Sequence, residues 1–364
     1  MGKNNNLNDE LEKLEELESF TDDFADLPPN DIVAYNELRS CADILRMHES
    51  GQLDISPDFQ RDIVWQNPAQ TRFIDSLIKQ LPIPSLCISL DYKTEKRLVI
   101  DGLQRITSII KFLSDDEWKL SEIIDIDERI AGKTVHTIKT KTKEIYTRVQ
   151  NLTIPVTVLR CDYAKKAHNE YLFTIFHRLN TGGAKLNNQE IRNCIYNGPL
   201  NTLLKNLASS KKWVKLFDLK KGNIYRFSNE EIILRFFAFH NRLGQYTGKL
   251  AKFLNDYMFD NRFPTVEFIA EKQFLFDESI DLIQKNIFDD KPIGNLSKAT
   301  TEALLIAVAT NIKHLQQQTP EQAKILYTEF RQLNEFSIDS LKEGLAAREK
   351  VITRINAAIN VFSK

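Results

Sequence analysis

Apolar side chains recur at three- and four-residue intervals along most of the chain after Ala164, the spacing that gathers them on one face of a helix. We predict from this pattern that the second half of the chain is mainly helical. Its helices are expected near 165–179, 187–196, 229–241, 248–259, 265–287, 297–316, 319–334 and 345–362.

The first half of the chain mixes helical spacing with shorter apolar runs. Ser40 and Asn67-Pro68 are residue types that begin helices, so helices are predicted to start at both. The run Leu103–Leu113 predicts a third helix. Strands are expected at 86–90 and 97–100 as a hairpin, at 153–159 as a buried strand, and as a short pair within 119–150.

These patterns divide the chain into an acidic arm and linker over 1–30, an α+β domain over 31–200 and a helical domain over 201–364. The expected fold class is α+β, with a mixed core followed by a mainly helical C-terminal unit. No apolar run approaches the roughly 18 residues that span a bilayer, and the first residues show no apolar export signal. We therefore expect a cytoplasmic protein with no membrane partner.

Charge is distributed unevenly, although the net charge is only -1. Residues 1–30 contain nine acidic side chains and two lysines, so this arm carries about -7 and the rest of the chain about +6. A mildly basic body suits phosphate-bearing partners. We interpret the arm as a solvated helix. The alternative is a DNA-mimicking or autoinhibitory arm that lies over a basic surface.

The most informative polar cluster is Asp101-Gly102-Leu103-Gln104-Arg105, where a predicted strand runs into a predicted helix. Backbone N–H groups at a helix start are free and the helix dipole favours negative charge there, so the position suits an anion. The structural alternative is that Asp101 caps the helix and Gly102 makes the turn. Arg105 fits this alternative poorly, because a cation in the first turn opposes the dipole unless a carboxylate or phosphate compensates it.

A second polar cluster, Pro57–Arg61, is followed by Trp65. Gln60 and Arg61 end an extended segment, from which side chains can project into a cleft. The planar guanidinium of Arg61 matches the geometry of phosphate oxygens. Trp65 could stack on a nucleotide base, but a tryptophan that follows two aliphatic residues is more often part of a core.

Two further clusters surround the end of one predicted helix and the start of the next. Asn180 and Gly182-Gly183 are typical of a helix C-terminus, because glycine tolerates the left-handed conformation, but this does not account for Arg178 beside them. Asn187 and Glu190 form a capping box at the next helix. The polar residues that these structural roles leave unexplained on that helix are Gln189, Arg192 and Asn193.

The order and spacing of four runs, PDFQR…W, LPIPSL, VIDGLQRITSI…FL and FHRLNTGGAKLNNQEIRN…YNG, resemble the GmrSD N-terminal domain family over about residues 35–200. The stretch from Arg226 to Gly248 is similar to the helical continuation of that family. The resemblance implies a ParB/sulfiredoxin-like core. It also implies a place in bacterial restriction or anti-phage systems, where this domain binds and hydrolyses nucleoside triphosphates to license DNA cleavage.

The resemblance also assigns roles to individual residues. Asp101 is implied to orient water or a metal ion, with Mg²⁺ expected, and Gln104 and Arg105 are implied to contact phosphate in catalysis. The family's usual Asp-Gly-Gln-Gln-Arg has Leu103 in place of its first Gln, so nucleotide contact or turnover is expected to differ there. The other expected nucleotide- or phosphate-binding residues are Gln60, Arg61, Gly102, Thr107, Phe176, Arg178, Asn180, Gln189, Arg192 and Asn193.

Histidine and cysteine placement argues against other kinds of site. The six histidines form no paired metal motif, and residues 241–364 contain only His314, so the His-Asn-His nuclease of many relatives is not expected here. The four cysteines have no CxxC spacing, which argues against zinc. DNA cleavage is therefore expected to need a separate nuclease subunit or the ParB-like core itself.

Three functional interpretations follow from these residues. The first is a regulator that binds or hydrolyses a nucleoside triphosphate. The second is a DNA-binding module, indicated by basic residues within Lys133–Arg148 and Lys211–Lys221, although lysine runs are usually solvated faces. The third is a non-catalytic subunit whose helical half docks a nuclease.

Overall fold

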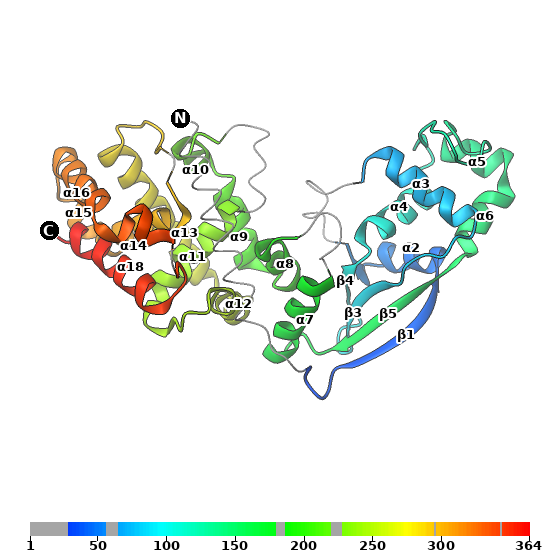
Figure 1. Cartoon of the computed structure of the whole chain (residues 1–364), viewed down its shortest axis with the longest axis horizontal. Coiled ribbons are helices and arrows are strands. Elements are labelled where there is room, and N and C mark those ends of the chain that lie inside the picture. The colour runs from blue at the N-terminus through cyan, green and yellow to red at the C-terminus, as the bar shows by residue number, and fades with distance from the viewer. Residues whose placement is uncertain (1–27, 56–64, 180–185, 220–227, 295, 343) are drawn as a thin grey trace. The chain divides into compact units, whose positions relative to one another are not determined.

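The computed structural model describes residues 28–364 except 56–64, 180–185, 220–227, 295 and 343. The described residues form two compact units, an α+β unit that ends at Leu186 and a helical unit that begins at Asn187 (Figure 1). The predicted α+β fold class is confirmed. The two units divide earlier than residue 200, because helix α8 (Asn188–Ile195) packs with helices of the second unit.

A five-stranded sheet organises the α+β unit. β3 and β4 form the predicted antiparallel hairpin, and β5 is the strand predicted after residue 152. β5 runs parallel to β3 and antiparallel to β1, and the short β2 runs parallel to β4. In the order β1-β5-β3-β4-β2, the strands are β1 (Val33–Ser40), β5 (Thr153–Cys161), β3 (Leu86–Asp91), β4 (Arg97–Asp101) and β2 (Leu53–Asp54).

Helices cover one face of this sheet (Figure 1). The helix starts predicted at Ser40 and Asn67 are confirmed, since Ser40 caps α2 and Asn67-Pro68 opens α3. Aliphatic side chains of β3 and β5, among them Ile88, Val156 and Val158, pack with those of the helices in one core. The helices are α2 (Cys41–Glu49), α3 (Asn67–Ile78), α4 (Leu103–Ser114), α5 (Val135–Lys141) and α6 (Lys143–Asn151).

The pair of short strands predicted within 119–150 is wrong. Two helices, α5 and α6, occupy most of that segment, and its strand-like pairing is limited to one isolated bridge between Lys119 and Thr134. β-branched residues such as Val135 and Ile138 suggested strands. Thr134 caps α5 through its side chain, and Val135 and Ile138 are three residues apart, so both are buried on one face of a helix.

The helix α7 (Lys166–Leu179) packs against β4. Side chains alternate along β4, so Val99 belongs to the core under α2–α6, whereas Leu98 and Ile100 point to the opposite face and are also buried. The buried apolar residues of α7 are Leu172, Phe173 and Phe176. α7 is therefore held beside the strand that ends at Asp101.

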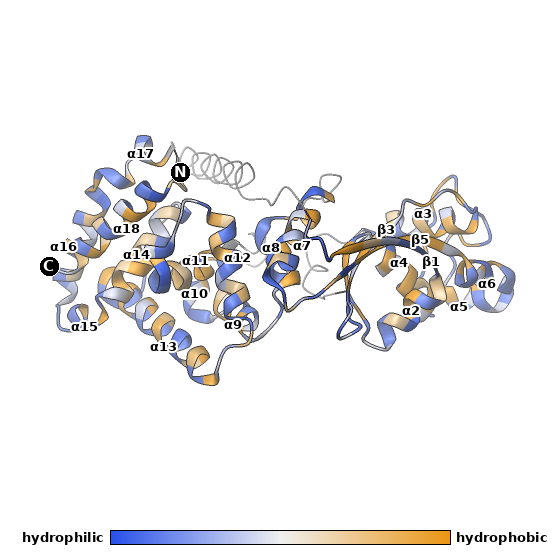
Figure 2. Ribbon diagram, turned by 90° about the horizontal axis from the view of Figure 1, so that it is seen from below, coloured by the Kyte–Doolittle hydropathy of each residue, from blue (hydrophilic) through white to orange (hydrophobic). Residues whose placement is uncertain are grey.

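The helical unit is built around α14 (Lys298–Thr310), whose residues from Ala299 to Ala309 are all buried. Figure 2 shows α14 among α11, α13 and α18, which pack against it directly or through one another. The helices are α8, α9 (Pro199–Ala208), α10 (Lys211–Leu216), α11 (Ser228–Arg242), α12 (Leu250–Asp260), α13 (Val266–Leu282) with the π-helical turn η3 (Ile283–Ile287), α14, α15 (Ile312–Leu315), α16 (Pro320–Gln332), α17 (Ile338–Lys342) and α18 (Arg348–Phe362).

The helices predicted after residue 164 are confirmed, with the segment 297–316 divided into α14 and α15. The helices α9, α10 and α17 were not predicted, since α10 and α17 are short and α9 begins at the proline of a Gly-Pro pair that reads as a loop. Among the described residues, no helix is both long enough and apolar enough to cross a membrane.

Candidate functional site

The junction between β4 and α4 is formed by Gly102 alone. Gly102 has a φ of 93°, in the left-handed region that other residues rarely adopt, and it is the N-cap residue of α4. A Cβ atom at this position would lie 2.3 Å from Leu86 Cδ2, which is far inside van der Waals contact. Both the backbone and the neighbouring strand therefore require glycine here.

The N-cap residue of α4 is a glycine, so it supplies no side-chain cap. Asp101 precedes the N-cap residue and does not cap the helix, in contrast to Ser40 of α2 and Thr134 of α5, whose side chains accept from backbone N–H groups. Helix N-termini without a side-chain acceptor suit an external anion. Asp101 therefore does not cap α4, as the structural alternative would require.

The side chain of Asp101 is paired with Arg105. Arg105 Nη2 donates to Asp101 Oδ2 at 2.7 Å, one helical turn along. The guanidinium is 13% exposed and the carboxylate 39% exposed, so the carboxylate faces solvent and the guanidinium lies behind it. The carboxylate that was expected to compensate a cation in the first turn of α4 is thus Asp101 itself.

Arg105 is also held by the segment that leads into β3. Its Nη1 donates to the carbonyl oxygens of Pro84 and, at 3.5 Å, Ser85. Prolines lack an N–H group and keep this segment extended, so its carbonyls are left for other donors. The two prolines are visible in the sequence as LPIPSL, but the role of Pro84 and Ser85 as hydrogen-bond acceptors was not predicted.

Gln104 and Thr107 differ in their hydrogen bonding. Gln104 Oε1 accepts from the backbone N–H of Trp65 at 2.8 Å, and Gln104 has further interactions. Thr107 Oγ1 is buried and has no hydrogen-bond partner within the described part of the chain. Trp65 packs edge-on against Phe73 at the margin of the α+β core, as the core interpretation of this residue predicts.

The residues predicted on α7 differ in exposure. Phe176 is buried, and Arg178 near the helix end is exposed. Because α7 packs against β4, both belong to the helix beside the Asp101 strand. Gln60, Arg61 and Asn180 lie outside the described residues.

Gln189, Arg192 and Asn193 lie together in the helical unit. The capping box of Asn187 and Glu190 predicted before them is present. Arg192 donates to Gln189 Oε1 at 3.1 Å, and Gln189 donates to Asn193 Oδ1 at 3.0 Å. All three side chains are buried, so their polar groups serve one another and the adjacent helices.

The partners of this cluster come from α11 and α12. Arg192 Nε donates to Asn255 Oδ1 at 2.9 Å, and Arg192 Nη1 donates to Glu231 Oε2 at 3.1 Å. Asn193 Nδ2 donates to Glu230 Oε2 at 2.7 Å. These bonds show why α8 belongs to the helical unit, and the nucleotide contacts predicted for its three residues stay a prediction.

Further buried charges extend the cluster. Arg235 pairs with Glu231 at 2.6 Å and with Glu302 at 3.6 Å, and Arg354 pairs with Glu302 at 3.0 Å. Burial raises the pKa of Glu231, but the positive charges of Arg235, Lys298 and Arg192 outweigh it and hold that pKa well below its usual value. We call Arg192, Glu231, Arg235, Glu302 and Arg354 the buried charge network. In the sequence, this network is indicated by charged residues at helical spacing within apolar segments.

The residues at the β4–α4 junction offer one carboxylate to a metal ion. The described residues contain no group of three or more His, Cys, Asp or Glu side chains that could hold a metal. Mg²⁺ commonly binds through one or two carboxylates together with substrate phosphates and water. Asp101 therefore fits Mg²⁺ as a ligand shared with a bound nucleotide, and does not fit it as part of an all-protein cage.

A separate hollow of about 690 Å³ lies where α6 meets the start of β5. It contains the basic residues Lys143 and Arg148, which were among those that indicated DNA binding, and also Glu144. None of the predicted site residues that the structure describes lines it. Its remaining lining residues are Gln80, Thr147, Asn151, Leu152 and Thr153.

Comparison with known proteins agrees with the motif pattern. No curated protein and no solved structure matches the chain. Residues 41–197 match the family model described as the GmrSD restriction endonuclease, N-terminal domain. The matched region contains the β4–α4 junction, α7 and α8. The match is limited to residues 41–197, and this GmrSD N-terminal domain indicates a component of a restriction system.

Proposed function

We propose that the β4–α4 junction of this restriction-system component binds a nucleoside triphosphate and hydrolyses it. The observation that supports this most is the Asp101–Arg105 pair at the start of α4. It combines a guanidinium, a helix start whose N-cap residue is glycine and a solvent-facing carboxylate within one helical turn. This combination suits a phosphate chain and the water that attacks it.

Arg105 supplies the charge that recognises phosphate. Its guanidinium is already oriented by the carbonyls of Pro84 and Ser85, so little conformational freedom is lost when an anion binds. In this structure the Asp101 carboxylate accepts from one side of the planar Arg105 guanidinium. A phosphate oxygen that takes this place would release Asp101 toward solvent.

Asp101, once released, would orient the attacking water and share Mg²⁺ with the nucleotide. The ion would supply charge neutralisation for the phosphate oxygens. Leu103 is partly buried against the α+β core and offers no polar group where the family has its first Gln. The proposed nucleotide site is completed by Gly102 at the junction, by Gln104 and Thr107 from α4, and by Gln60, Arg61, Phe176, Arg178 and Asn180 from other segments.

Titration calorimetry of the purified chain with each of the four nucleoside triphosphates and Mg²⁺ tests this proposal. Arg105→Ala should weaken binding by about 10- to 150-fold, which corresponds to the roughly 1.5–3 kcal/mol of a hydrogen bond to a charged group. Arg46→Ala is the matched control, because Arg46 forms a similar helical pair with Asp43 at 2.9 Å on α2. Unchanged binding in Arg105→Ala, or equal loss in both variants, contradicts the proposed site.

The hollow at α6 favours DNA as a second ligand. Lys143 and Arg148 offer two cations against Glu144, in a surface that is separate from the Asp101 junction. Binding to the DNA backbone falls steeply with added salt, whereas a single nucleotide in a pocket loses less affinity. If the Lys143→Gln and Arg148→Gln double substitution leaves DNA binding unchanged, this hollow is excluded as the DNA site.

A further inference from the structure

The Asp101 carboxylate belongs to a row of side chains that crosses four strands of the sheet. Asp101 of β4 is opposite Cys87 of β3. Cys87 is opposite Thr157 of β5, and Thr157 is opposite Asn36 of β1. Directly opposed residues point to the same side of a sheet. Because Val158, the next residue on β5, packs with α2–α6, the row lies on the opposite face.

A shift in the pairing of β3 with β4 places Asp101 in this row. The register changes between Cys87 and Ile88, and Ile88 is opposite Val99. An unbroken register would put Ile100 opposite Cys87, but Asp101 takes that place. Irregularities of this kind re-aim a side chain and are common beside active sites. The pairing is therefore adapted locally to present Asp101 on the face away from α2–α6.

The thiol in the row is not a reactive group. Cys87 is buried, and this burial together with the nearby charge of Asp101 raises the pKa of the thiol to about 12. The thiolate is the reactive form of cysteine, so Cys87 stays neutral and inert near neutral pH. Beyond Asp101, the polar members of the row that reach the surface are Asn36, which is exposed, and Thr157, which is half-buried.

Hydrogen bonds between side chains connect Asn36, Thr157 and Ser85. Thr157 Oγ1 donates to Asn36 Oδ1 at 2.9 Å, and Ser85 Oγ lies 3.2 Å from Thr157 Oγ1. Because the single hydroxyl proton of Thr157 is directed to Asn36, Thr157 accepts from Ser85. The Ser85 hydroxyl also lies 3.2 Å from the carbonyl oxygen of Pro155 on β5. These contacts hold Ser85 against β5.

Ser85 lies just outside the backbone pairing of the sheet. The pairing of β3 with β5 begins one residue later, where Leu86 is opposite Val156. Pro84, the residue before Ser85, has no backbone N–H group that could fix the segment by donating a hydrogen bond. The contacts of the Ser85 hydroxyl with β5 therefore decide where the backbone carbonyls of Pro84 and Ser85 point.

Arg105 depends on the direction of these two carbonyls. Its Nη1 donates to the carbonyl oxygen of Pro84 and, at 3.5 Å, to that of Ser85. Its Nη2 donates to Asp101 in the row. A movement of the Pro84–Ser85 segment would remove acceptors from one side of the guanidinium and allow it to turn. The side chains of β1 and β5 are thus connected to Arg105 through Ser85.

We propose that Thr157 and Asn36 are positioning residues for Arg105, because they hold the segment whose carbonyls aim its guanidinium. This role rests on the proposed function of the β4–α4 junction, and it adds residues of β5 and β1 to those that set the affinity of that site for phosphate. Hydrogen bonds at exposed positions contribute little to folding. An orienting role accounts for a connected run of them beside Arg105.

A double-mutant cycle of nucleotide affinity tests whether Thr157 acts through Arg105. Titration calorimetry of the full chain uses Mg²⁺ and whichever of ATP, CTP, GTP and UTP binds the wild-type chain most tightly. Thr157→Val keeps the shape of the side chain but removes the hydroxyl, and it should weaken binding about fivefold. In an Arg105→Ala chain the same substitution should change the affinity by less than about twofold, because the group that Thr157 positions is gone. Equal losses in both chains, or no loss in either, overturn the proposal.

Two further variants control for the substitution itself. Thr157→Ser keeps the hydroxyl and should bind nucleotide within about twofold of the wild-type chain. Thr140→Val on α5 removes an exposed hydroxyl, which donates to the His136 carbonyl at 2.8 Å, and should leave nucleotide affinity unchanged. Valine suits a strand as well as threonine does, so Thr157→Val should remain folded. If Thr157→Ser binds as weakly as Thr157→Val, the effect comes from the packing of β5 and the proposal fails.

The side-chain NMR signal of Arg105 tests the positioning role without nucleotide. The Nε–Hε resonance is assigned by its loss in Arg105→Ala. Thr157→Val should shift or broaden this resonance, whereas Thr157→Ser and Thr140→Val should not. An unchanged resonance in Thr157→Val overturns the proposal. If the wild-type chain binds none of the four nucleotides, the proposed function of the junction fails, and the Arg105 resonance alone decides whether Thr157 positions the guanidinium.

Discussion

Arg105 faces Asp101 across the strand-to-helix junction, with Arg105 Nη2 2.7 Å from Asp101 Oδ2. The pair explains how a cation is tolerated in the first turn of α4, because the carboxylate one turn earlier offsets its unfavourable interaction with the helix dipole. It also guides the choice of variants, since removal of one partner leaves the other without its charge. Substitutions that keep the hydrogen bond between the two side chains therefore best distinguish a loss of catalysis from a loss of stability.

Asp101→Asn should be folded, should bind nucleotide and should not hydrolyse it. The asparagine oxygen can still accept from Arg105, so the change in unfolding free energy should stay within about 1 kcal/mol. The amide carries no charge for Mg²⁺ or for the attacking water. Phosphate release with Mg²⁺ and each nucleoside triphosphate measures the effect, and Asp43→Asn on α2 is the matched control. Full hydrolysis by Asp101→Asn rules out the proposed role.

Gly102→Ala should destabilise the chain by about 2 kcal/mol or more, since a left-handed alanine costs about 1–2 kcal/mol and overpacking adds to it. The added Cβ would meet Leu86 Cδ2 at 2.3 Å. Gly51→Ala separates the two effects, because Gly51 has a φ of 68° but nothing within 4 Å of its Cβ position. Denaturant unfolding of both variants measures the difference. Equal losses would mean that the Leu86 contact relaxes freely.

Thr107→Val should stabilise the ligand-free chain by about 1 kcal/mol, because it removes a buried hydroxyl that has no partner among the described residues. It should also reduce nucleotide affinity, as the resemblance assigns Thr107 to the nucleotide site. Thermal unfolding with and without nucleotide reports both effects. A variant that is more stable and binds nucleotide normally removes Thr107 from the site.

Arg235→Ala should cost about 3–5 kcal/mol, the usual loss when one partner of a buried ion pair is removed. Glu231 and Glu302 would remain buried with less compensating charge. Arg331→Ala on α16 serves as an exposed control and should change the unfolding free energy by less than about 0.5 kcal/mol. A small effect in Arg235→Ala would show that water can enter the buried charge network.

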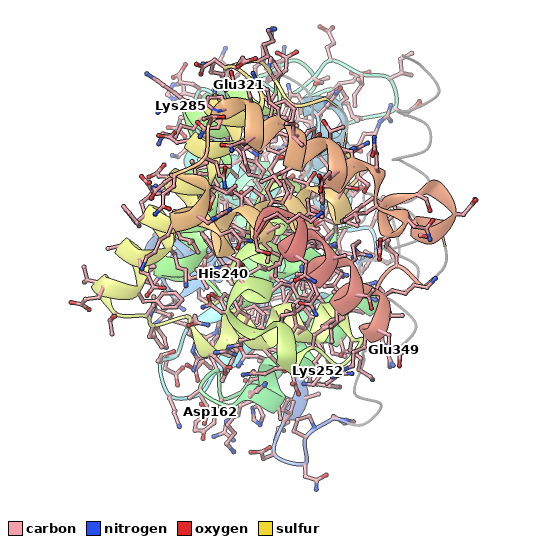
Figure 3. All side chains as sticks on the ribbon, turned by 90° about the vertical axis from the view of Figure 1, so that its left-hand side faces the viewer. Asp162, His240, Lys252, Lys285, Glu321 and Glu349 are labelled. Atoms are coloured by element: carbon pink, nitrogen blue, oxygen red, sulfur yellow. The ribbon has the colours of Figure 1, made fainter. Side chains whose placement is uncertain are left out.

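Acid should weaken the helical unit through His240 of α11 (Figure 3). Burial, with Lys272 nearby, lowers the pKa of His240 below its ordinary 6.5. The unfolded chain therefore takes up this proton first, and stability present above pH 6.5 is lost as pH falls toward the folded-state pKa. His240→Gln should flatten the dependence of unfolding free energy on pH below about 6.5.

The pH range of that experiment separates His240 from Asp31. Hydrogen bonds from Lys165 and His168 lower the pKa of Asp31 to about 2, so its contribution to stability is lost only at a much lower pH. An unchanged pH slope in His240→Gln would assign the acid sensitivity to a different residue. Denaturant titrations at fixed ionic strength give the slope directly.

Local chemistry was predictable where the sequence itself contains both the signal and its partner. The Asn187–Glu190 capping box, the hairpin before Asp101 and the compensation of Arg105 all depend on residues within a few positions of one another. The prediction for the segment 119–150 was wrong although its signal is also local, because β-branched residues favour strands in general and the helix cap at Thr134 was not recognised. The compact units divide before α8, whose partners lie 37 to 63 residues further along the chain.

The buried charge network also limits how this chain can be recombined. A crossover after residue 200 would keep α8 but replace α11 and α12, leaving Arg192 buried against helices that lack Glu231 and Asn255. A hybrid joined at Leu186, where the compact units divide, keeps every charge with its partner. We expect that natural exchange of C-terminal halves among relatives, like successful chimaeras in the laboratory, has its joint before α8.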